Sequence, residues 1–227
     1  MIASYRIRKF NVLVGLLAGL SICSSVNAAS FDCAKASKPF EKLICSNPEL
    51  DEADGAMGLA YKDAVQSVPL KGFVSLSQRW FVAGYSSCTL DNSGKNQFDK
   101  SAVSRCVAVA KARAEELKSY STSKFYSNAQ GKFSQEDLAI VQYVKSGKNM
   151  VKMWGNWMPD AYQHKPFPNG VMCDIDAELL PAKGGFRTDS TDDAVLKFTD
   201  QSVTISTWIM CSPRTGISEG DYKRIRN

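Results

Sequence analysis

The sequence predicts an α+β protein, in which an N-terminal disulfide-stabilised helical bundle is followed by a small antiparallel β module. Three observations lead to this fold class. Apolar residues recur at helical spacing between residues 50 and 120, and β-prone runs separated by turn residues follow Pro159. Four cysteines lie between residues 33 and 106, and two more lie at 173 and 211. A polar stretch over 119–131 separates the two parts, which predicts domains over 30–122 and 132–227.

Residues 1–29 have the three-part pattern of a secretory signal peptide. A basic start is followed by an apolar run from Phe10 to Cys23, and then by small residues up to Ala29. The apolar run is about 14 residues long, shorter than the ~20 that a membrane-spanning helix needs. We therefore expect cleavage near Ala28 or Ala29, a periplasmic or secreted mature protein, and no integral membrane segment after cleavage.

The charge of the mature chain is close to neutral. Removing the signal peptide leaves 25 basic and 23 acidic residues, a net charge of +2. Such a balance gives no reason to expect nucleic acid or an anionic lipid surface as a partner.

Three helices are expected in the first part. The first runs from about Leu50, with Pro48 in its first turn, and Pro69 stops it. The second covers about 73–87, with Trp80 among its inward residues, and the third covers about 101–120.

The cysteines predict three disulfides. Cys23 leaves with the signal peptide, and an even number of cysteines in an exported chain is typical of a disulfide framework. Cys173–Cys211 would tie the β module together. The other four collect at one end of the bundle, where either Cys33–Cys45 with Cys88–Cys106 or crossed pairings would fit.

The second part is expected to begin with a short helix and to continue as strands. Ser134 and Asp137 form a capping box, and Gly147 would end that helix. Strands are expected over 171–175, 195–198 and 203–210, the last two joined as a hairpin by the turn at 199–202.

The first part contains a set of residues at characteristic positions: Phe31 to Ala36, Pro39 to Cys45, Pro48 to Leu50, Asp54, Tyr61, Gln78, Trp80, Cys88, Cys106, Arg113 and Leu117. Together these residues resemble the N-terminal domain of the LprI family of lysozyme inhibitors. The resemblance covers residues 31–120. It implies non-covalent binding of a protein partner, a lysozyme or another cell-wall hydrolase. Where that family usually has an arginine and then an acid, this chain has Gly84 and Tyr85.

The residue inventory favours a protein without catalytic activity, cofactor or metal. The single histidine, His164, lies in a loop-like stretch, and no Gly-x-Ser-x-Gly motif is present. Asp174 and Asp176 should face the same way on a strand, as a carboxylate pair, a calcium contact or, by preference, a solvated face. The same solvated reading applies to the acids at 189, 192 and 193, and Gly184-Gly185 reads as a turn.

Two groups are candidates for binding. Glu49, Asp51, Glu52 and Asp54 make one end of the bundle acidic, which would steer it toward a basic lysozyme or would merely complement the helix dipole. An aromatic and methionine cluster is either core, which we favour, or an apolar patch; its members are Met150, Met153, Trp154, Trp157 and Met158. The sequence thus predicts an exported binding protein of the lysozyme-inhibitor kind. The alternatives are an envelope immunity protein that binds another toxin and an envelope hydrolase.

Overall fold

The helical half of the molecule contains four α-helices. The computed structural model describes residues 29–129, 137–155, 173–189, 194–207, 209–212 and 215–226. The helices are α1 (Pro39–Ser46), α2 (Pro48–Ser67), α3 (Lys71–Tyr85) and α4 (Lys100–Ser119). Those expected from about 50, over 73–87 and over 101–120 are confirmed, because each buries one face of regular spacing. Helix α1 was not expected. Glu41 stabilises its first turn by accepting the N–H groups of Ser37 and Lys38 at 2.9 and 3.0 Å.

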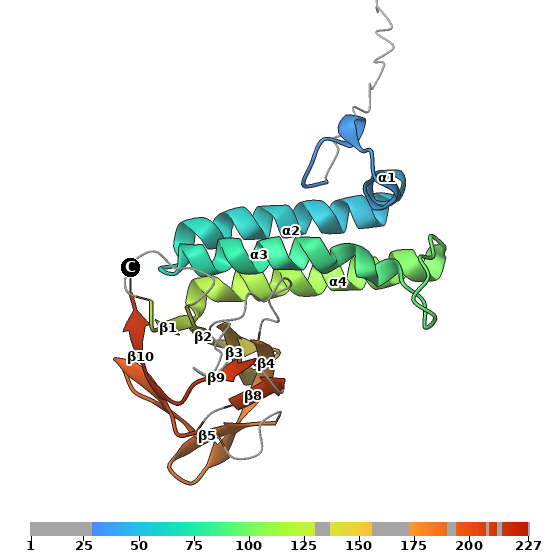
Figure 1. Cartoon of the computed structure of the whole chain (residues 1–227). Coiled ribbons are helices and arrows are strands. Elements are labelled where there is room, and N and C mark those ends of the chain that lie inside the picture. Colours follow the sequence, from blue (N-terminus) through green and yellow to red (C-terminus); the bar gives the residue numbers. More distant parts are fainter. Residues whose placement is uncertain are drawn as a thin grey trace, which may run out of the picture.

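The β half is a closed antiparallel barrel, so the predicted fold class is wrong. Its strands follow one another around the barrel as β1-β10-β7-β6-β5-β4-β3-β2, and β2 closes it on β1. We expected a small β module after a helical bundle and found eight strands in a barrel (Figure 1). The strands are β1 (Lys124–Ser127), β2 (Ala139–Lys145), β3 (Lys148–Gly155), β4 (Cys173–Ala182), β5 (Gly185–Thr188), β6 (Leu196–Phe198), β7 (Ser202–Ile205) and β10 (Gly220–Ile225).

The helix expected over 134–147 is also wrong for the part that the structure describes. Residues 139–145 form strand β2, and Ser146 and Gly147 make its turn into β3, with φ angles of 51° and 78°. Glycine after an apolar run suits a helix end and a tight hairpin equally well. The run itself is apolar almost without interruption because β2 buries both faces, and this hides the alternation of a strand.

The hairpin expected around 199–202 is confirmed as β6 and β7, with Leu196 opposite Ile205 and Phe198 opposite Val203. Strand β7 ends at Ile205, earlier than expected. A separate hairpin follows, made of β8 (Ile209–Ser212) and β9 (Thr215–Ile217). Its residues Ile209 and Ile217 are buried in the barrel core.

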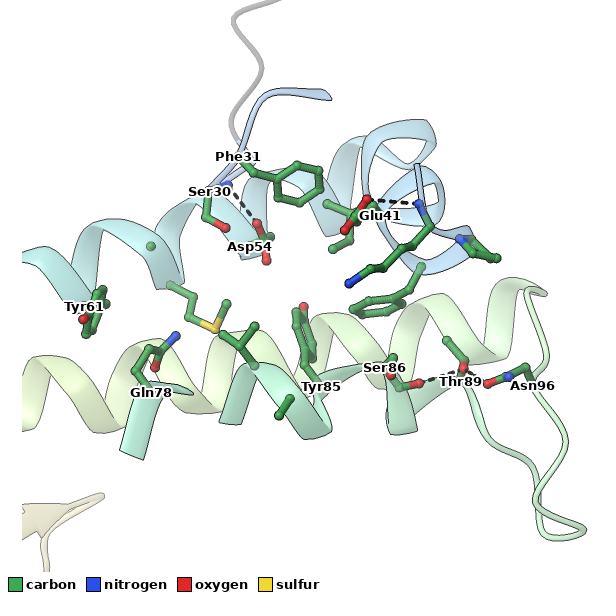
Figure 2. A pocket seen from close by; sticks show the side chains of 18 of the residues that line it. Ser30, Phe31, Glu41, Asp54, Tyr61, Gln78, Tyr85, Ser86, Thr89 and Asn96 are labelled. Carbon is green, nitrogen blue, oxygen red and sulfur yellow. Dashed lines mark hydrogen bonds between the residues drawn. The ribbon is translucent and has the colours of Figure 1, made fainter. Parts of the chain in front are cut away.

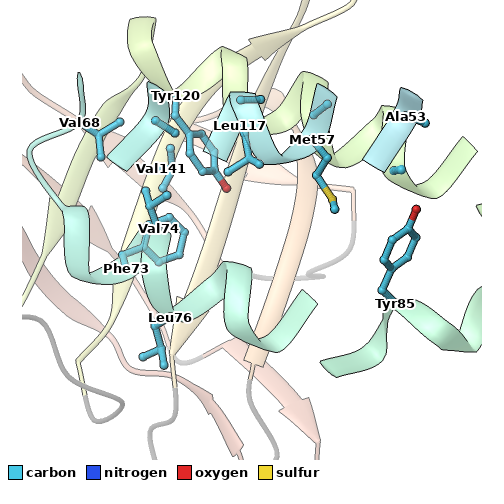
Figure 3. Packing of buried hydrophobic residues seen from close by; sticks show 14 of the residues in the cluster. Ala53, Met57, Val68, Phe73, Val74, Leu76, Tyr85, Leu117, Tyr120 and Val141 are labelled. Atoms are coloured by element: carbon cyan, nitrogen blue, oxygen red, sulfur yellow. The ribbon is translucent and has the colours of Figure 1, made fainter. Parts of the chain in front are cut away.

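Of the two hydrophobic cores in the described residues, one lies inside the barrel and the other is shared by the helices and the outer face of the barrel. Alternate residues of β1, β2 and β3 point into the barrel, among them Tyr126, Ile140 and Met153. Their neighbours point outward and pack against the helices (Figure 3). The Phe73 ring of α3 lies 5.8 Å from Trp154 and 6.5 Å from Phe125, measured between ring centroids. Met153 and Trp154 therefore lie on opposite faces of β3 rather than in one cluster.

Three disulfides are present in the described chain, as the cysteine count predicts. Of the open pairings, the structure has Cys33–Cys45 with Cys88–Cys106, and the third is Cys173–Cys211. Their Cα atoms are 5.7, 5.1 and 5.6 Å apart, within the usual range for disulfides. None of the helices described is both long and apolar enough to cross a bilayer.

Candidate functional site

An open groove lies between the N-terminal segment and helices α1, α2 and α3. It has a volume of about 920 Å³, and the loop that follows α3 closes one end of it (Figure 2). Its apolar lining includes Phe31, Phe40, Met57, Val82 and Phe98. This size and lining are typical of sites that take up an apolar group from a ligand or partner.

Buried polar side chains line the groove between its apolar walls. Asp54 of α2 is 2 % exposed, and its carboxylate accepts the N–H of Ser30 at 2.8 Å. The Tyr85 hydroxyl of α3 donates to the carbonyl of Cys106, with 3.4 Å between the oxygens. Burial raises the pKa of Tyr85 far above its usual value, and the nearby charge of Asp54 adds to this effect. Tyr85 is therefore a neutral hydrogen-bonding group rather than a base.

Exposed apolar side chains form the rim of the groove. Val82 and Phe98 are 56 % and 49 % exposed. Trp80 of α3, the helix that also carries Val82, was expected to point inward but is 41 % exposed, so that prediction is wrong. The inner face of α3 at this level is occupied instead by Ser77 and Gln78, which both accept hydrogen bonds from Arg113 at 3.0 Å.

The four acidic residues singled out at the start of α2 have different surroundings. Glu49 and Glu52 are exposed, and Glu49 lies 3.4 Å from the ammonium of Lys111. Asp51 and Asp54 instead face the N-terminal segment, where they accept the backbone N–H groups of residues 29 and 30. Two of the acids are therefore available at the surface, and two are engaged within the protein.

A second group of charges joins the helices to the barrel. The Glu116 carboxylate of α4 accepts hydrogen bonds from Arg113 (2.7 Å) and Tyr120 (2.6 Å), and it pairs with Lys152 of β3 at 2.9 Å. Lys152 also pairs with Asp174 of β4 at 3.0 Å. Burial alone would raise the pKa of Glu116, but Lys152, Arg113 and the hydrogen bonds lower it to about 2. Because these groups satisfy one another, we interpret them as a structural connection.

Asp174 and Asp176 lie on the outer face of β4, two residues apart, as expected for the same side of a strand. Asp176 accepts a hydrogen bond from Tyr143 of β2, and Asp174 meets Lys152. Asp189 accepts the N–H of Glu178 at 3.2 Å. The turn predicted at Gly184-Gly185 is shifted by one residue: Lys183 and Gly184 join β4 to β5, and Gly185 begins β5. His164, Trp157, Met158, Asp192 and Asp193 lie outside the described residues.

Within the described ranges, no group of three or more histidine, cysteine, aspartate or glutamate residues is arranged to hold a metal ion. Comparison of the chain with protein-family models, with curated proteins and with solved structures found no match.

Sequence reasoning missed the groove and the buried charge network. The groove has no local signal, because five separate segments build it. The charge network does have a local signal in the sequence, because Lys152 interrupts the apolar run from Met150 to Trp154. A lone charge in a strand that is buried on both faces requires a partner from the element packed on it.

Proposed function

We propose that the protein is exported and that, after cleavage near Ala28 or Ala29, it acts by non-covalent protein binding, in the manner of the lysozyme inhibitors that its first part resembles. The three disulfides support an oxidising compartment such as the periplasm or the exterior of the cell. The partner is a lysozyme or another cell-wall hydrolase, and the protein itself catalyses no reaction.

One observation carries this proposal: the groove exposes apolar side chains at its rim. Val82 and Phe98 remain largely exposed although they border a cavity of about 920 Å³. Apolar anchors that enter such a cavity dominate the energy of many protein interfaces. The exposed acids Glu49 and Glu52 at the start of α2 would steer a basic partner by long-range attraction.

A muramidase assay with the mature protein tests the proposal. We expect lysozyme activity to fall as the protein is added in excess, and a complex to be detectable by gel filtration. Val82→Glu and Phe98→Ala should each weaken binding at least about tenfold, which corresponds to about 1.4 kcal/mol.

Val144→Glu is the matched control, because Val144 is an exposed apolar residue on β2, outside the groove lining. This variant should bind like the original protein. If lysozyme stays fully active at excess protein and no complex forms, the proposal fails. If Val144→Glu weakens binding as much as the groove variants do, the groove is not the binding site.

A further inference from the structure

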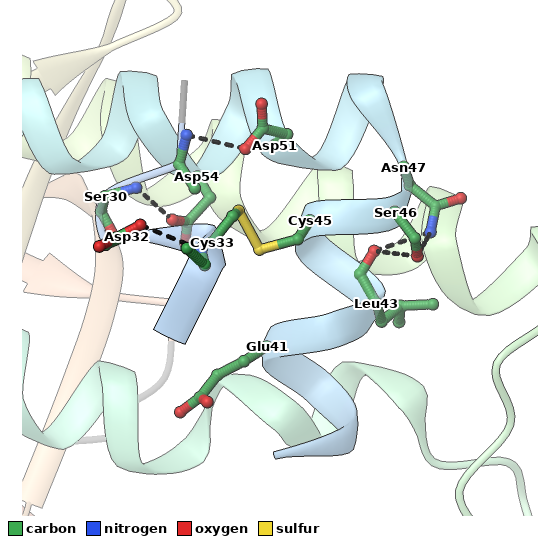
Figure 4. The surroundings of a disulfide bond; sticks show 12 residues. Ser30, Asp32, Cys33, Glu41, Leu43, Cys45, Ser46, Asn47, Asp51 and Asp54 are labelled. Atoms are coloured by element: carbon green, nitrogen blue, oxygen red, sulfur yellow. Dashed lines mark hydrogen bonds between the residues drawn. A yellow bond between two sulfur atoms is a disulfide. The ribbon is translucent and has the colours of Figure 1, made fainter. Parts of the chain in front are cut away.

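The N-terminal segment is held by two carboxylates on one face of α2. The backbone N–H of Ala29 donates to Asp51 Oδ1 at 2.8 Å, and that of Ser30 donates to Asp54 Oδ2 at 2.8 Å. Figure 4 shows Asp51, Asp54 and Ser30 at this contact. The two acids are three residues apart and therefore neighbours on the helix surface. Two successive backbone nitrogens thus meet two carboxylates that lie about one helical turn apart.

Gly58 shapes the same surface for close approach of the segment. It lies four residues after Asp54, on the same helix face, and a Cβ atom there would come within 2.8 Å of the Ser30 Cβ atom. The Cys33–Cys45 disulfide ties the segment to α1, just before α2 begins. We call Asp51, Asp54 and Gly58 the N-terminal seat.

The buried charge of Asp54 exceeds what a neutral amide requires. Asp54 is almost fully buried, and the contact described for its carboxylate is an uncharged N–H group. A buried carboxylate is costly unless a positive charge lies close to it. An ammonium group at residue 29 would supply that charge, beside Asp51 and one helical turn from Asp54.

We propose that the N-terminal seat binds the α-ammonium group of Ala29, which forms when the signal peptide is cut between Ala28 and Ala29. In this hydrolysis the oxygen of water becomes part of the Ala28 carboxylate. Its two hydrogens go to the Ala29 nitrogen, which becomes an ammonium. A hydrogen bond from a neutral N–H to Asp51 then becomes an ion pair. The inference rests on the export step of the proposed function.

Processing would thereby complete the groove. Ser30 and Phe31 follow the seat directly and line the groove on its α2 side. Only a chain cut before Ala29 places the ammonium at Asp51, so the wall that these residues form is held most firmly in the mature protein.

The titration of the Ala29 amine tests the inference, with N-terminal sequencing of the exported protein as its first step. The chain should begin at Ala29, and NMR shifts of Ala29 followed from pH 6 to pH 10 should give an amine pKa above the usual range of about 7.7–8.0. Asp51→Asn should return this pKa to that range. Asp63→Asn removes the same charge from an exposed position of α2 and should leave it raised.

The other titratable groups around the seat and groove are Asp54, Tyr61 and Lys62 of α2, Tyr85 of α3, and Lys38 and Glu41 of α1. The titration is read from the NMR shifts of Ala29 itself, so it reports the amine rather than these side chains. Since its folded pKa is raised, its stabilising effect is full below about pH 7.7 and disappears as the pH rises through the folded pKa.

A chain with one extra alanine before Ala29 keeps every side chain and moves the amine away. It should melt at a lower temperature than the mature chain at pH 6.5, and the difference should vanish at high pH. A different N-terminus, an amine pKa in the ordinary range, or equal melting of the two chains at pH 6.5 would overturn the inference. None of these measurements uses a lysozyme. Failure of this inference can therefore be distinguished from failure of the binding proposal.

Discussion

Lys152 is the residue on which the contact between helices and barrel depends most. It lies on β3 between Met150 and Trp154, buried, and its ammonium reaches Glu116 of α4 and Asp174 of β4. Removing one partner of a buried ion pair leaves the other charge without compensation, which costs more than the pair itself contributes.

We therefore expect Lys152→Met to lower the free energy of unfolding by roughly 3–5 kcal/mol. Lys148→Met on the same strand is the control, because Lys148 is exposed and its ion pair with Glu178 should contribute far less to stability. Urea unfolding at pH 7 measures both. Equal losses for the two variants would contradict the buried role of Lys152.

Glu116 makes the stability of the protein depend on pH in the acid range. Its pKa is lowered from 4.5 to about 2 in the folded protein, so its contribution is full above about pH 4.5 and is lost as the pH falls toward 2. Urea unfolding of the wild type and Glu116→Gln at a series of pH values should show a stability difference that is constant above pH 5 and shrinks in this window. Glu115→Gln, at the exposed neighbouring position, is the matched control for removing one carboxylate from α4. A difference that is independent of pH would disprove the lowered pKa.

At the level of elements, helices that bury one face were predicted from the sequence, whereas strand β2, which buries two faces, was missed. Helices α2, α3 and α4 expose a polar side, and their periodicity located them within a few residues. Strand β2 has helices on one side and the barrel interior on the other, so its sequence shows no alternation.

The turn between β2 and β3 gives a direct test of that hairpin. Ser146 and Gly147 both have positive φ angles, which asparagine and glycine adopt most readily. Gly147→Ala should lower the free energy of unfolding by about 1 kcal/mol or more, whereas Ser146→Asn should raise it by a few tenths. Thermal melts of the two variants measure this. Destabilisation by Ser146→Asn would contradict the two-residue turn.

At the level of the whole molecule, the helices and the barrel should unfold together. The expected boundary between two modules falls near β1, yet the outer faces of β1, β2 and β3 belong to the core that the helices build. Phe73 is fully buried in it, between Tyr120, which directly follows α4, and Trp154 of the barrel, at ring-centroid distances of 6.0 and 5.8 Å. No sequence pattern within either half predicts this contact, because Phe73 and Trp154 are about 80 residues apart in the sequence.

Phe73→Ala should therefore destabilise both halves equally, by roughly 3–5 kcal/mol. Hydrogen exchange of peptides at increasing urea reports the opening free energy of each region separately. Peptides from α2 and from β3 should lose protection at the same urea concentration, in the wild type and in the variant, with the transition shifted to lower urea in the variant. Leu59→Ala on the exposed face of α2 should shift neither by more than about 0.5 kcal/mol. If Phe73→Ala lowered the protection of α2 and left β3 unchanged, the two halves would unfold independently. The stability of the groove on the helices would then not depend on the barrel.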